Sequence, residues 1–333
     1  GVGVIASDPQ KVVPVAALGF SAQDMNQFIR QLDGRSPTEF TAQADAAPGL
    51  PLSDCRLLAP IPRPQQDVVC LGVNYYEHRD ETLASNIKYD GQLNKTIYFS
   101  KRVNRAVDPN GAIESHADLT SQLDYEVELA VILGRDAKNV PMDQVKDYVL
   151  GYTILNDVSA RDLQAAHQQW YFGKSLDNFT PMGPWIVTRD EFDWMPKTGI
   201  RSYVNGELRQ NSSTDLMMTS IEDAVHQLTQ GVTLLAGTII AMGTPSGVGM
   251  AFTATWSAAR STASAHWKIR WSETSPGFLR RRRKKIKKRK LRSASSFLVG
   301  FFCLRSTASA CPPEPCRDGP RRGPSRGRCR EWR

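Results

Sequence analysis

Cysteine is scarce in most of this chain. Residues 1–252 contain only Cys55 and Cys70, which are too few for a disulfide framework and indicate a reducing, cytoplasmic environment. The sequence also lacks an apolar N-terminal signal segment, and its apolar runs fall short of the roughly 18 residues that span a bilayer. We therefore expect neither a disulfide-stapled secreted domain nor a protein that works in a membrane.

Acidic residues are almost missing from the last quarter of the chain. Residues 253–333 hold 22 of the 42 Lys and Arg but 4 of the 34 Asp and Glu, so this segment carries a formal charge of +18. Residues 1–252 hold the other 20 basic and 30 acidic residues and carry −10. The acidic part gives no long-range attraction for an anionic ligand, so local cations must supply it.

The N-terminal region reads as a small lobe. GVGVIASDPQKVVPVAAL predicts two short strands joined by a polar turn, and SAQDMNQFIRQL predicts a helix capped by Ser21. The prolines of LLAPIPRPQQD mark a linker, so the lobe is expected to cover residues 1–66. Because the chain starts at Gly1 inside a strand pattern, without an initiator Met, we expect that its true beginning is missing.

Residues 67–252 predict an α+β domain dominated by strands. Helical patterns are limited to MDQVKDYV, SARDLQAAHQQW and IEDAVHQLTQ. Ser159, with Asp162 three residues later, fits a capping box, so a helix is expected to begin just after Asp157. The excess of strands favours a mixed, β-dominated fold over a doubly wound sheet. Strand patterns occur in DVVCLGVNY, NKTIYFSKR, DYEVELAVIL, VLGYTILND, WIVT, SYVNGEL and GTIIAMG.

Three carboxylates share one face of the predicted strand DYEVELAVIL. Side chains alternate along a strand, so Asp124, Glu126 and Glu128 point the same way and repel one another. Either water solvates them or a positive group lies among them. Sets of two or three carboxylates suit hard divalent cations, and Asp157, at the end of GYTIL, offers a further ligand. On spacing alone, a solvated strand face and a helix N-cap at Asp157 explain the same residues.

Five ordered blocks resemble the fumarylacetoacetate hydrolase family: NYYEH, DYEVELAVI, GYTILNDVSARDLQ, FGKSLDNFTPMGPW and GTPSGVG. The resemblance covers about residues 67–252. It implies a mixed β-roll in which Glu126, Glu128 and Asp157 hold a divalent metal, Mg²⁺ or Mn²⁺, with Ca²⁺ as a further option. It also implies a homodimer.

His78 and Glu81 lie three residues apart in GVNYYEHRDE and would share one face of a short helix. A neutral imidazole can take a proton from water while a carboxylate fixes its tautomer and stabilises the cation that forms. Alone, such a spacing most often marks a surface ion pair. The resemblance implies instead that this dyad sits on a lid over the metal and is the general base.

The resemblance also implies roles for residues outside the metal ligands and the dyad. Lys174 would reach the metal site and offset negative charge on an oxo acid or on its enolate. Gln164 and Thr244 match positions that bind substrate through hydrogen bonds, and Lys101 and Arg105 are candidates for binding a substrate carboxylate. Without the resemblance, an ordinary exposed lysine and a tight loop describe Lys174 and the GTPSGVG turn equally well.

These parts predict a metal-dependent hydrolase that cleaves a carbon–carbon bond in a small anionic 2-oxo acid such as an acylpyruvate. His78 and Glu81 would activate water, the metal would polarise the 2-oxo group, and Lys174 would help to stabilise the enolate that leaves. Without an attacking water, the same groups would serve decarboxylation of an oxaloacetate-type acid or isomerisation of an unsaturated oxo diacid. The residues do not choose among these reactions.

The family pattern ends after GTPSGVGMAF. Neither the family's K-P-G-D loop nor its final strand follows, and the loss of such strands would leave a sheet edge unpaired. The basic composition of residues 253–333, rich in Ser, Pro, Gly and Arg, predicts disorder. The simplest explanation is a shifted reading frame or a wrongly assigned gene end.

Because of this tail, two alternatives of another class remain open. The chain could be an inactive product, or a polybasic protein whose run RRRRKKIKKRKLR binds nucleic acid or another polyanion. A zinc site is only weakly indicated, because the four tail cysteines lack a C-x-x-C pair. These cysteines are Cys303, Cys311, Cys316 and Cys329.

Overall fold

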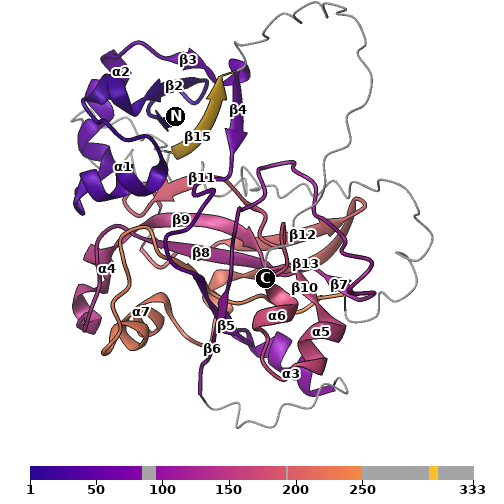
Figure 1. Cartoon of the computed structure of the whole chain (residues 1–333). Helices are drawn as coiled ribbons and strands as arrows, with labels where there is room; N and C mark the ends of the chain where they lie inside the picture. The colour runs from indigo at the N-terminus through magenta and orange to yellow at the C-terminus, as the bar shows by residue number, and fades with distance from the viewer. Residues whose placement is uncertain (85–94, 193, 250–299, 307–333) are drawn as a thin grey trace, which may run out of the picture.

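The computed structural model of the chain describes residues 1–84, 95–192, 194–249 and 300–306. Most of its strands belong to one mixed sheet that runs through the whole molecule (Figure 1). The strands of this sheet are β1 (Val2–Ile5), β2 (Lys11–Pro14), β3 (Leu50–Pro51), β4 (Cys55–Leu58), β5 (Val68–Gly72), β6 (Ile97–Lys101), β8 (Val127–Leu133), β9 (Val149–Asn156), β11 (Met182–Thr188), β14 (Ile239–Ala241) and β15 (Gly300–Ser306).

The eleven strands follow the order β3-β2-β1-β15-β11-β9-β8-β14-β5-β6, with β4 paired to β15 beside this path. β14 pairs in parallel with β5, whereas β8 pairs antiparallel with both β9 and β14. Two separate ribbons complete the strand set: β7 (Leu123–Asp124) with β10 (Ser159–Ala160), and β12 (Gly199–Val204) with β13 (Glu207–Ser213). The predicted strand-dominated α+β class is confirmed.

Short helices surround the sheet. Figure 1 shows α1 and α2 in the N-terminal lobe, α4 and α7 together at one side of the body, and α3, α5 and α6 gathered at another. The helices are α1 (Met25–Leu32), α2 (Thr41–Ala46), α3 (Tyr76–Ala84), α4 (Val145–Tyr148), α5 (Arg161–Ala166), α6 (Tyr171–Lys174) and α7 (Ile221–Thr229), with single 3-10 turns at Val15–Leu18, Pro37–Phe40, Leu52–Asp54, Met142–Gln144 and Thr214–Leu216. Among the described helices, none is long and apolar enough to cross a membrane.

Strand β8 is buried at all of its positions because both of its faces are covered. Ala130 and Ile132 pack into a core shared with helix α1, and Val131 and Leu133 pack into a core shared with α7. Burial of each of the three larger side chains, Val131, Ile132 and Leu133, contributes roughly 1.5–3 kcal/mol. A slip of one residue would exchange the two faces, so this packing fixes the register of β8 and of the acidic residues beside it.

Strand β15 comes from the part of the chain for which the sequence predicts disorder. It lies between β1 and β11, with Val2 opposite Cys303 and Ile186 opposite Phe301 along the backbone. It also pairs with β4 over residues 303–306. The backbone of residues 300–306 therefore covers edges of β1, β4 and β11 that would otherwise be unpaired.

The predicted cap of α1 is wrong. The helix begins at Met25, and Asp24 rather than Ser21 is its N-cap. The Asp24 carboxylate accepts a hydrogen bond of 2.8 Å from the Gln27 backbone N–H. An aspartate satisfies a free N–H at a helix start as well as a serine does, so the spacing alone did not separate the two.

The capping box predicted at Ser159 is also wrong. α5 begins at Arg161, and Ser159 lies in strand β10. The Ser159 hydroxyl donates to the Asp157 carbonyl oxygen at 3.0 Å, and Asp162 accepts hydrogen bonds from Thr120. The N-cap of α5 is Ala160 and no side chain caps it, so Asp157 does not cap this helix, and Asp157 is fully buried.

Candidate metal centre and active site

Three carboxylates converge at one end of the β8–β9 pair. Ligand atoms of Glu126, Glu128 and Asp157 all lie within 4.8 Å of one another, and the three residues are buried. The predicted continuous strand is interrupted here, since β7 ends at Asp124 and β8 begins at Val127. The Asp157 N–H donates to the Glu126 carbonyl oxygen at 2.8 Å, so backbone pairing holds the two distant segments together.

Two lysine ammonium groups lie among these carboxylates. Lys174 Nζ is 2.6 Å from Glu126 Oε2 and 2.7 Å from Asp157 Oδ2. Lys101 Nζ is 2.6 Å from Asp157 Oδ1. Both ammonium groups are buried, and each also lies over an aromatic ring, Lys174 over Phe99 at 5.1 Å. The repulsion among these carboxylates is therefore offset by two lysines of the chain itself.

Arg161 is a member of this cluster that the sequence reasoning missed. Its Nη2 atom lies 2.7 Å from Glu126 Oε1 and 2.8 Å from Asp124 Oδ2. Arg161 thus pairs with both carboxylates, and Asp124 lies outside the group of three carboxylates whose oxygens approach one another within 4.8 Å. The sequence SARDLQ already shows that the charged Arg161 directly follows a buried strand. Only the fold shows which carboxylates Arg161 contacts.

Glu126 and Glu128 lie in different electrostatic surroundings although they share one motif. Burial would raise the pKa of Glu126, but Lys174, Arg161 and His78 together lower it to about 2. Burial and the neighbouring Asp157 and Glu126 carboxylates raise the pKa of Glu128 well above its usual range. In the described part of the chain no ion pair reaches Glu128, and its Oε2 accepts one backbone hydrogen bond of 2.8 Å, from Gly243.

The donor set fits a hard divalent cation. All three candidate ligands are carboxylates, the class that Mg²⁺, Mn²⁺ and Ca²⁺ prefer. Glu128 is a buried carboxylate without a counter-charge of its own, which is costly unless a cation compensates it. A dication bound by Glu126, Glu128 and Asp157 would remove that cost.

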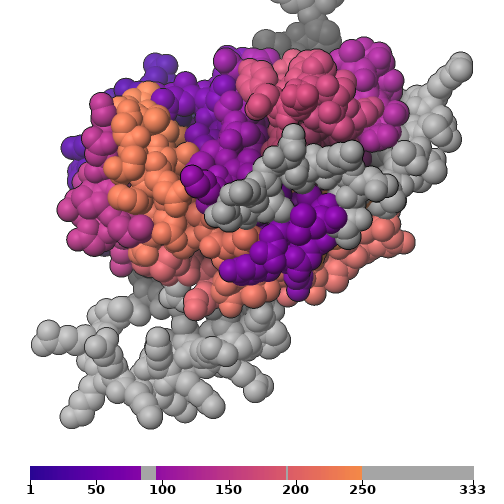
Figure 2. Space-filling model, turned by 90° about the horizontal axis from the view of Figure 1, so that it is seen from below, coloured from indigo at the N-terminus to yellow at the C-terminus, as the bar shows by residue number. Residues whose placement is uncertain are grey.

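The predicted His78 and Glu81 dyad is formed on helix α3. His78 Nδ1 lies 3.0 Å from Glu81 Oε2, and the His78 residue is only 7% exposed. The other carboxylate oxygen of Glu81 accepts a hydrogen bond of 3.2 Å from the Gly247 N–H. Figure 2 shows the purple segment that includes this helix at the surface, beside orange residues from the C-terminal part of the described body. The pair is therefore anchored to the protein rather than free in solvent.

A pocket lies between the dyad and the carboxylates. His78 and Glu126 both line it, together with the predicted substrate-binding residues Gln164 and Thr244. Aromatic side chains form part of its wall. The full lining is Leu71, Gly72, Val73, His78, Thr82, Phe99, Glu126, Arg161, Gln164, Trp170 and Thr244.

The remaining predicted substrate ligands take other places. Lys101 is fully buried, and its ammonium is held by Asp157 and by the Val158 carbonyl oxygen. Arg105 pairs with Asp108 near the surface. Neither lines the pocket, so the structure does not bring them to a position for binding a substrate carboxylate.

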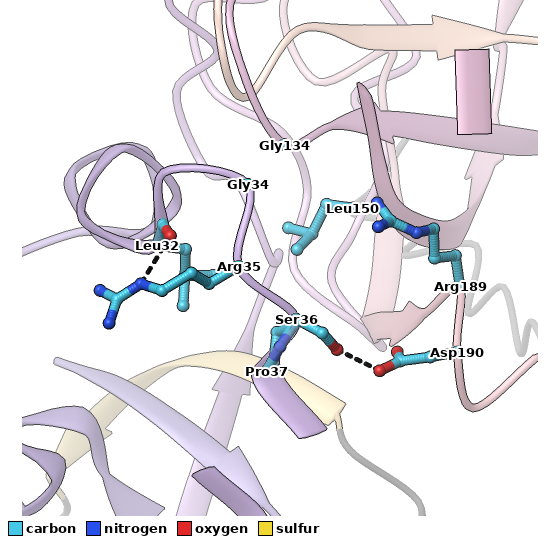
Figure 3. Close-up of a pocket in the computed structure, with 9 residues that line it drawn as sticks. All are labelled: Leu32, Gly34, Arg35, Ser36, Pro37, Gly134, Leu150, Arg189 and Asp190. Atoms are coloured by element: carbon cyan, nitrogen blue, oxygen red, sulfur yellow. Dashed lines mark hydrogen bonds between the residues drawn. The ribbon is translucent and has the colours of Figure 1, made fainter. Parts of the chain in front are cut away.

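A second cavity lies where the N-terminal lobe meets the body (Figure 3). Ser36 and Pro37 come from the lobe, and Arg189 and Asp190 from the body. The Ser36 hydroxyl donates to the Asp190 carboxylate. This cavity contains none of the clustered carboxylates, so we place the chemistry in the first pocket.

Comparison with known proteins relates this chain to an enzyme family. The family model for the fumarylacetoacetate (FAA) hydrolase C-terminal domain matches residues 67–281. The oxaloacetate tautomerase YisK of Bacillus subtilis is 42% identical over 202 residues, which are 61% of this chain and 66% of that protein. This chain thus spans slightly less than two thirds of that relative's length.

Two solved structures extend the comparison to the fold. A fumarylacetoacetate hydrolase from Exiguobacterium antarcticum is 35% identical, with a TM-score of 0.60 over 75% of this chain and 88% of that one. A maleylpyruvate hydrolase from Sphingobium sp. SYK-6, solved with manganese(II) and pyruvate, is 27% identical, with a TM-score of 0.59 over 74% and 86%. With the family model matching more than half of the sequence, this chain belongs to the fumarylacetoacetate hydrolase family.

Proposed function

We propose that this protein is a divalent-metal-dependent enzyme that interconverts the keto and enol forms of a small anionic 2-oxo diacid of the oxaloacetate type. The observation that supports the proposal is that His78, the predicted general base, lines the same pocket as Glu126, one of the three candidate metal ligands. Keto–enol interconversion needs only proton transfer next to a polarised carbonyl, and these two parts provide it. The 42% identity with a relative named oxaloacetate tautomerase favours the same reaction.

The metal, held by Glu126, Glu128 and Asp157, would polarise the 2-oxo group and lower the pKa of the adjacent C–H. His78 takes the C3 proton, the C2–C3 double bond forms as the C2–O double bond becomes single, and the oxygen takes up a proton from the imidazolium or from water to give the enol. Because Nδ1 of the neutral ring donates its hydrogen to Glu81, Nε2 is the atom that accepts the substrate proton. The Glu81 carboxylate then stabilises the imidazolium that results. Lys174 and Arg161 limit the negative charge that the cluster presents to an anionic substrate.

The experiment compares three reactions of the purified chain with Mn²⁺ or Mg²⁺. Oxaloacetate is followed for enol–keto exchange and, separately, for decarboxylation to pyruvate, and an acylpyruvate is followed for hydrolysis. The His78→Asn variant should lose at least about a hundredfold of the exchange rate, the usual contribution of a general base. The matched control is His116→Asn, a histidine outside the pocket. Exchange no faster than in metal-containing buffer alone would refute the proposal.

Acylpyruvate hydrolysis is a second candidate. It is favoured by the likeness to a maleylpyruvate hydrolase that was solved with manganese(II) and pyruvate. His78 and Glu81 would then deprotonate a water molecule instead of a carbon. Production of pyruvate from an acylpyruvate without oxaloacetate exchange would select this candidate over the first.

A further inference from the structure

A buried amide side chain links the candidate ligand strand to the pocket. Gln210 lies on β13 and is completely buried, yet all four of its hydrogen-bonding positions are used. Its Oε1 accepts from the Val127 N–H at 3.1 Å and from the Ser202 hydroxyl at 2.9 Å. Its Nε2 donates to Thr244 Oγ1 at 2.7 Å and to the Pro245 carbonyl oxygen at 2.9 Å.

The orientation of this amide is forced by its backbone partners. The Val127 N–H can only donate and the Pro245 carbonyl can only accept, so Oε1 must face Val127 and Nε2 must face Pro245. With the amide turned the other way, a buried donor would meet a donor and an acceptor would meet an acceptor. Nε2 therefore points a hydrogen at Thr244.

This orientation settles what the Thr244 hydroxyl does. A hydroxyl has one hydrogen and two acceptor lone pairs. Thr244 Oγ1 accepts from Gln210 and lies 3.0 Å from the Val127 carbonyl oxygen, to which it must donate its single hydrogen. One acceptor position is left, and Thr244 lines the pocket. Towards a ligand, the Thr244 hydroxyl thus acts as an acceptor.

We infer that Gln210 is a positioning residue that commits the Thr244 hydroxyl to accept a hydrogen bond from the ligand, and that the donor is the enol hydroxyl of a 2-oxo acid. The keto form of the same acid has a carbonyl there and no hydrogen to give. This contact therefore favours the enol over the keto form. The inference rests on the proposed function and deepens it, because it names the form of the substrate that the pocket binds better.

The test is a binding experiment, so it does not depend on turnover. The full chain loaded with Mn²⁺ is titrated with pyruvate, which has a carbonyl at C2, and with each lactate enantiomer, which has a hydroxyl donor there. The measured quantity is the ratio of the lactate Kd to the pyruvate Kd. In Thr244→Val this ratio should rise about threefold to tenfold for one enantiomer, the usual effect of one hydrogen bond. Thr244→Ser keeps the hydroxyl and should keep the ratio.

Gln210→Met supplies the second arm. Without Nε2 the Thr244 hydroxyl is free to turn and donate to the pyruvate carbonyl, so the ratio should rise as in Thr244→Val. A purely structural role would weaken both ligands equally and leave the ratio unchanged. An unchanged ratio in Thr244→Val, or weaker binding of pyruvate alone, would overturn the inference even if Gln210→Met fails to fold. If the native chain catalyses no oxaloacetate exchange but the Kd ratio shifts in the variants as expected, the proposed function fails and the role of Thr244 stands.

Discussion

Lys174 Nζ lies 2.6 Å from Glu126 Oε2, and both residues are almost completely buried. The ammonium also contacts Asp157, so one lysine bridges two of the three candidate metal ligands. Burial opposes its charge, but these two carboxylates raise the pKa of Lys174 above its usual value. The cluster is thus held together by protein charges before any metal binds.

Replacement of Lys174 by methionine should destabilise the metal-free protein by about 3–5 kcal/mol, because two buried carboxylates lose their counter-charge. Added Mn²⁺ should recover part of this loss, since a dication compensates the same carboxylates. Urea unfolding with and without Mn²⁺ measures both effects. The control is Lys146→Met on the exposed side of α4, which should change little. An equal loss of stability with and without Mn²⁺ would contradict the view that Lys174 and the metal compensate the same carboxylates.

Glu128 should make the metal-free protein less stable as the pH rises. Its pKa is raised in the folded state, so above about pH 4.3, the usual value for an unfolded glutamate, the folded protein holds a proton that the unfolded chain has released. Stability therefore falls with pH through that window. Unfolding measured across pH should show this slope in the native protein and lose it in Glu128→Gln. A slope that persists in the variant would assign it to another group.

Removal of one ligand should abolish metal binding without unfolding the protein. Glu126→Ala takes a carboxylate from the triad, and Arg161 keeps its contact with Asp124. Calorimetric titration with Mn²⁺ should show at least about a hundredfold weaker binding, because loss of a partner that merely orients a ligand already costs about tenfold to a hundredfold. The control is Glu114→Ala, an exposed carboxylate outside the triad. Unchanged affinity in Glu126→Ala would refute the ligand assignment.

Asp190 should tie the N-terminal lobe to the body in a pH-dependent way. Burial raises the pKa of Asp190, but hydrogen bonds from the Ser36 and Thr38 hydroxyls help to outweigh it, and that pKa is lowered. Figure 3 shows the bond from Ser36. A lowered carboxylate pKa stabilises the fold above the unfolded value, about 3.9, and this stability is lost as the pH falls through the folded value. The stability difference between the native protein and Asp190→Asn should therefore shrink in acid. A stability difference that does not change with pH would argue against this role of the Asp190 carboxylate.

The part of the tail that forms strand β15 should be necessary for the stability of the sheet. A chain ending at residue 252 loses the backbone partner of β1, β4 and β11, whereas one ending at residue 306 keeps it. The shorter chain should unfold more easily and aggregate through its open edge. Urea unfolding and light scattering of the two truncated chains compare them directly. Equal behaviour would show that the sheet does not depend on this strand.

Much of the fold could be predicted from local sequence patterns. The strand GTIIAMG and the helix IEDAVHQLTQ form as β14 and α7 because apolar periodicity acts over neighbouring residues. The caps at Ser21 and Ser159 were predicted wrongly, because several nearby polar residues can satisfy the same backbone groups. The strand from Asp124 was predicted as continuous but is interrupted, because β7 pairs with β10 whereas β8 pairs with β9.

The sequence by itself determined which residues carry the candidate chemistry: the E-x-E pair of Glu126 and Glu128, and the dyad of His78 and Glu81 one helical turn apart. Spacing along one strand or one helix put each pair on a common face, and the resemblance to the family singled these pairs out from a solvated strand face or a surface ion pair. Only the tertiary structure decided that Arg161 and Lys174 neutralise Glu126, and that Gln210 turns the Thr244 hydroxyl. Those contacts join segments far apart in the chain, and strand pairing and burial, rather than any local pattern, choose which charged and polar groups meet.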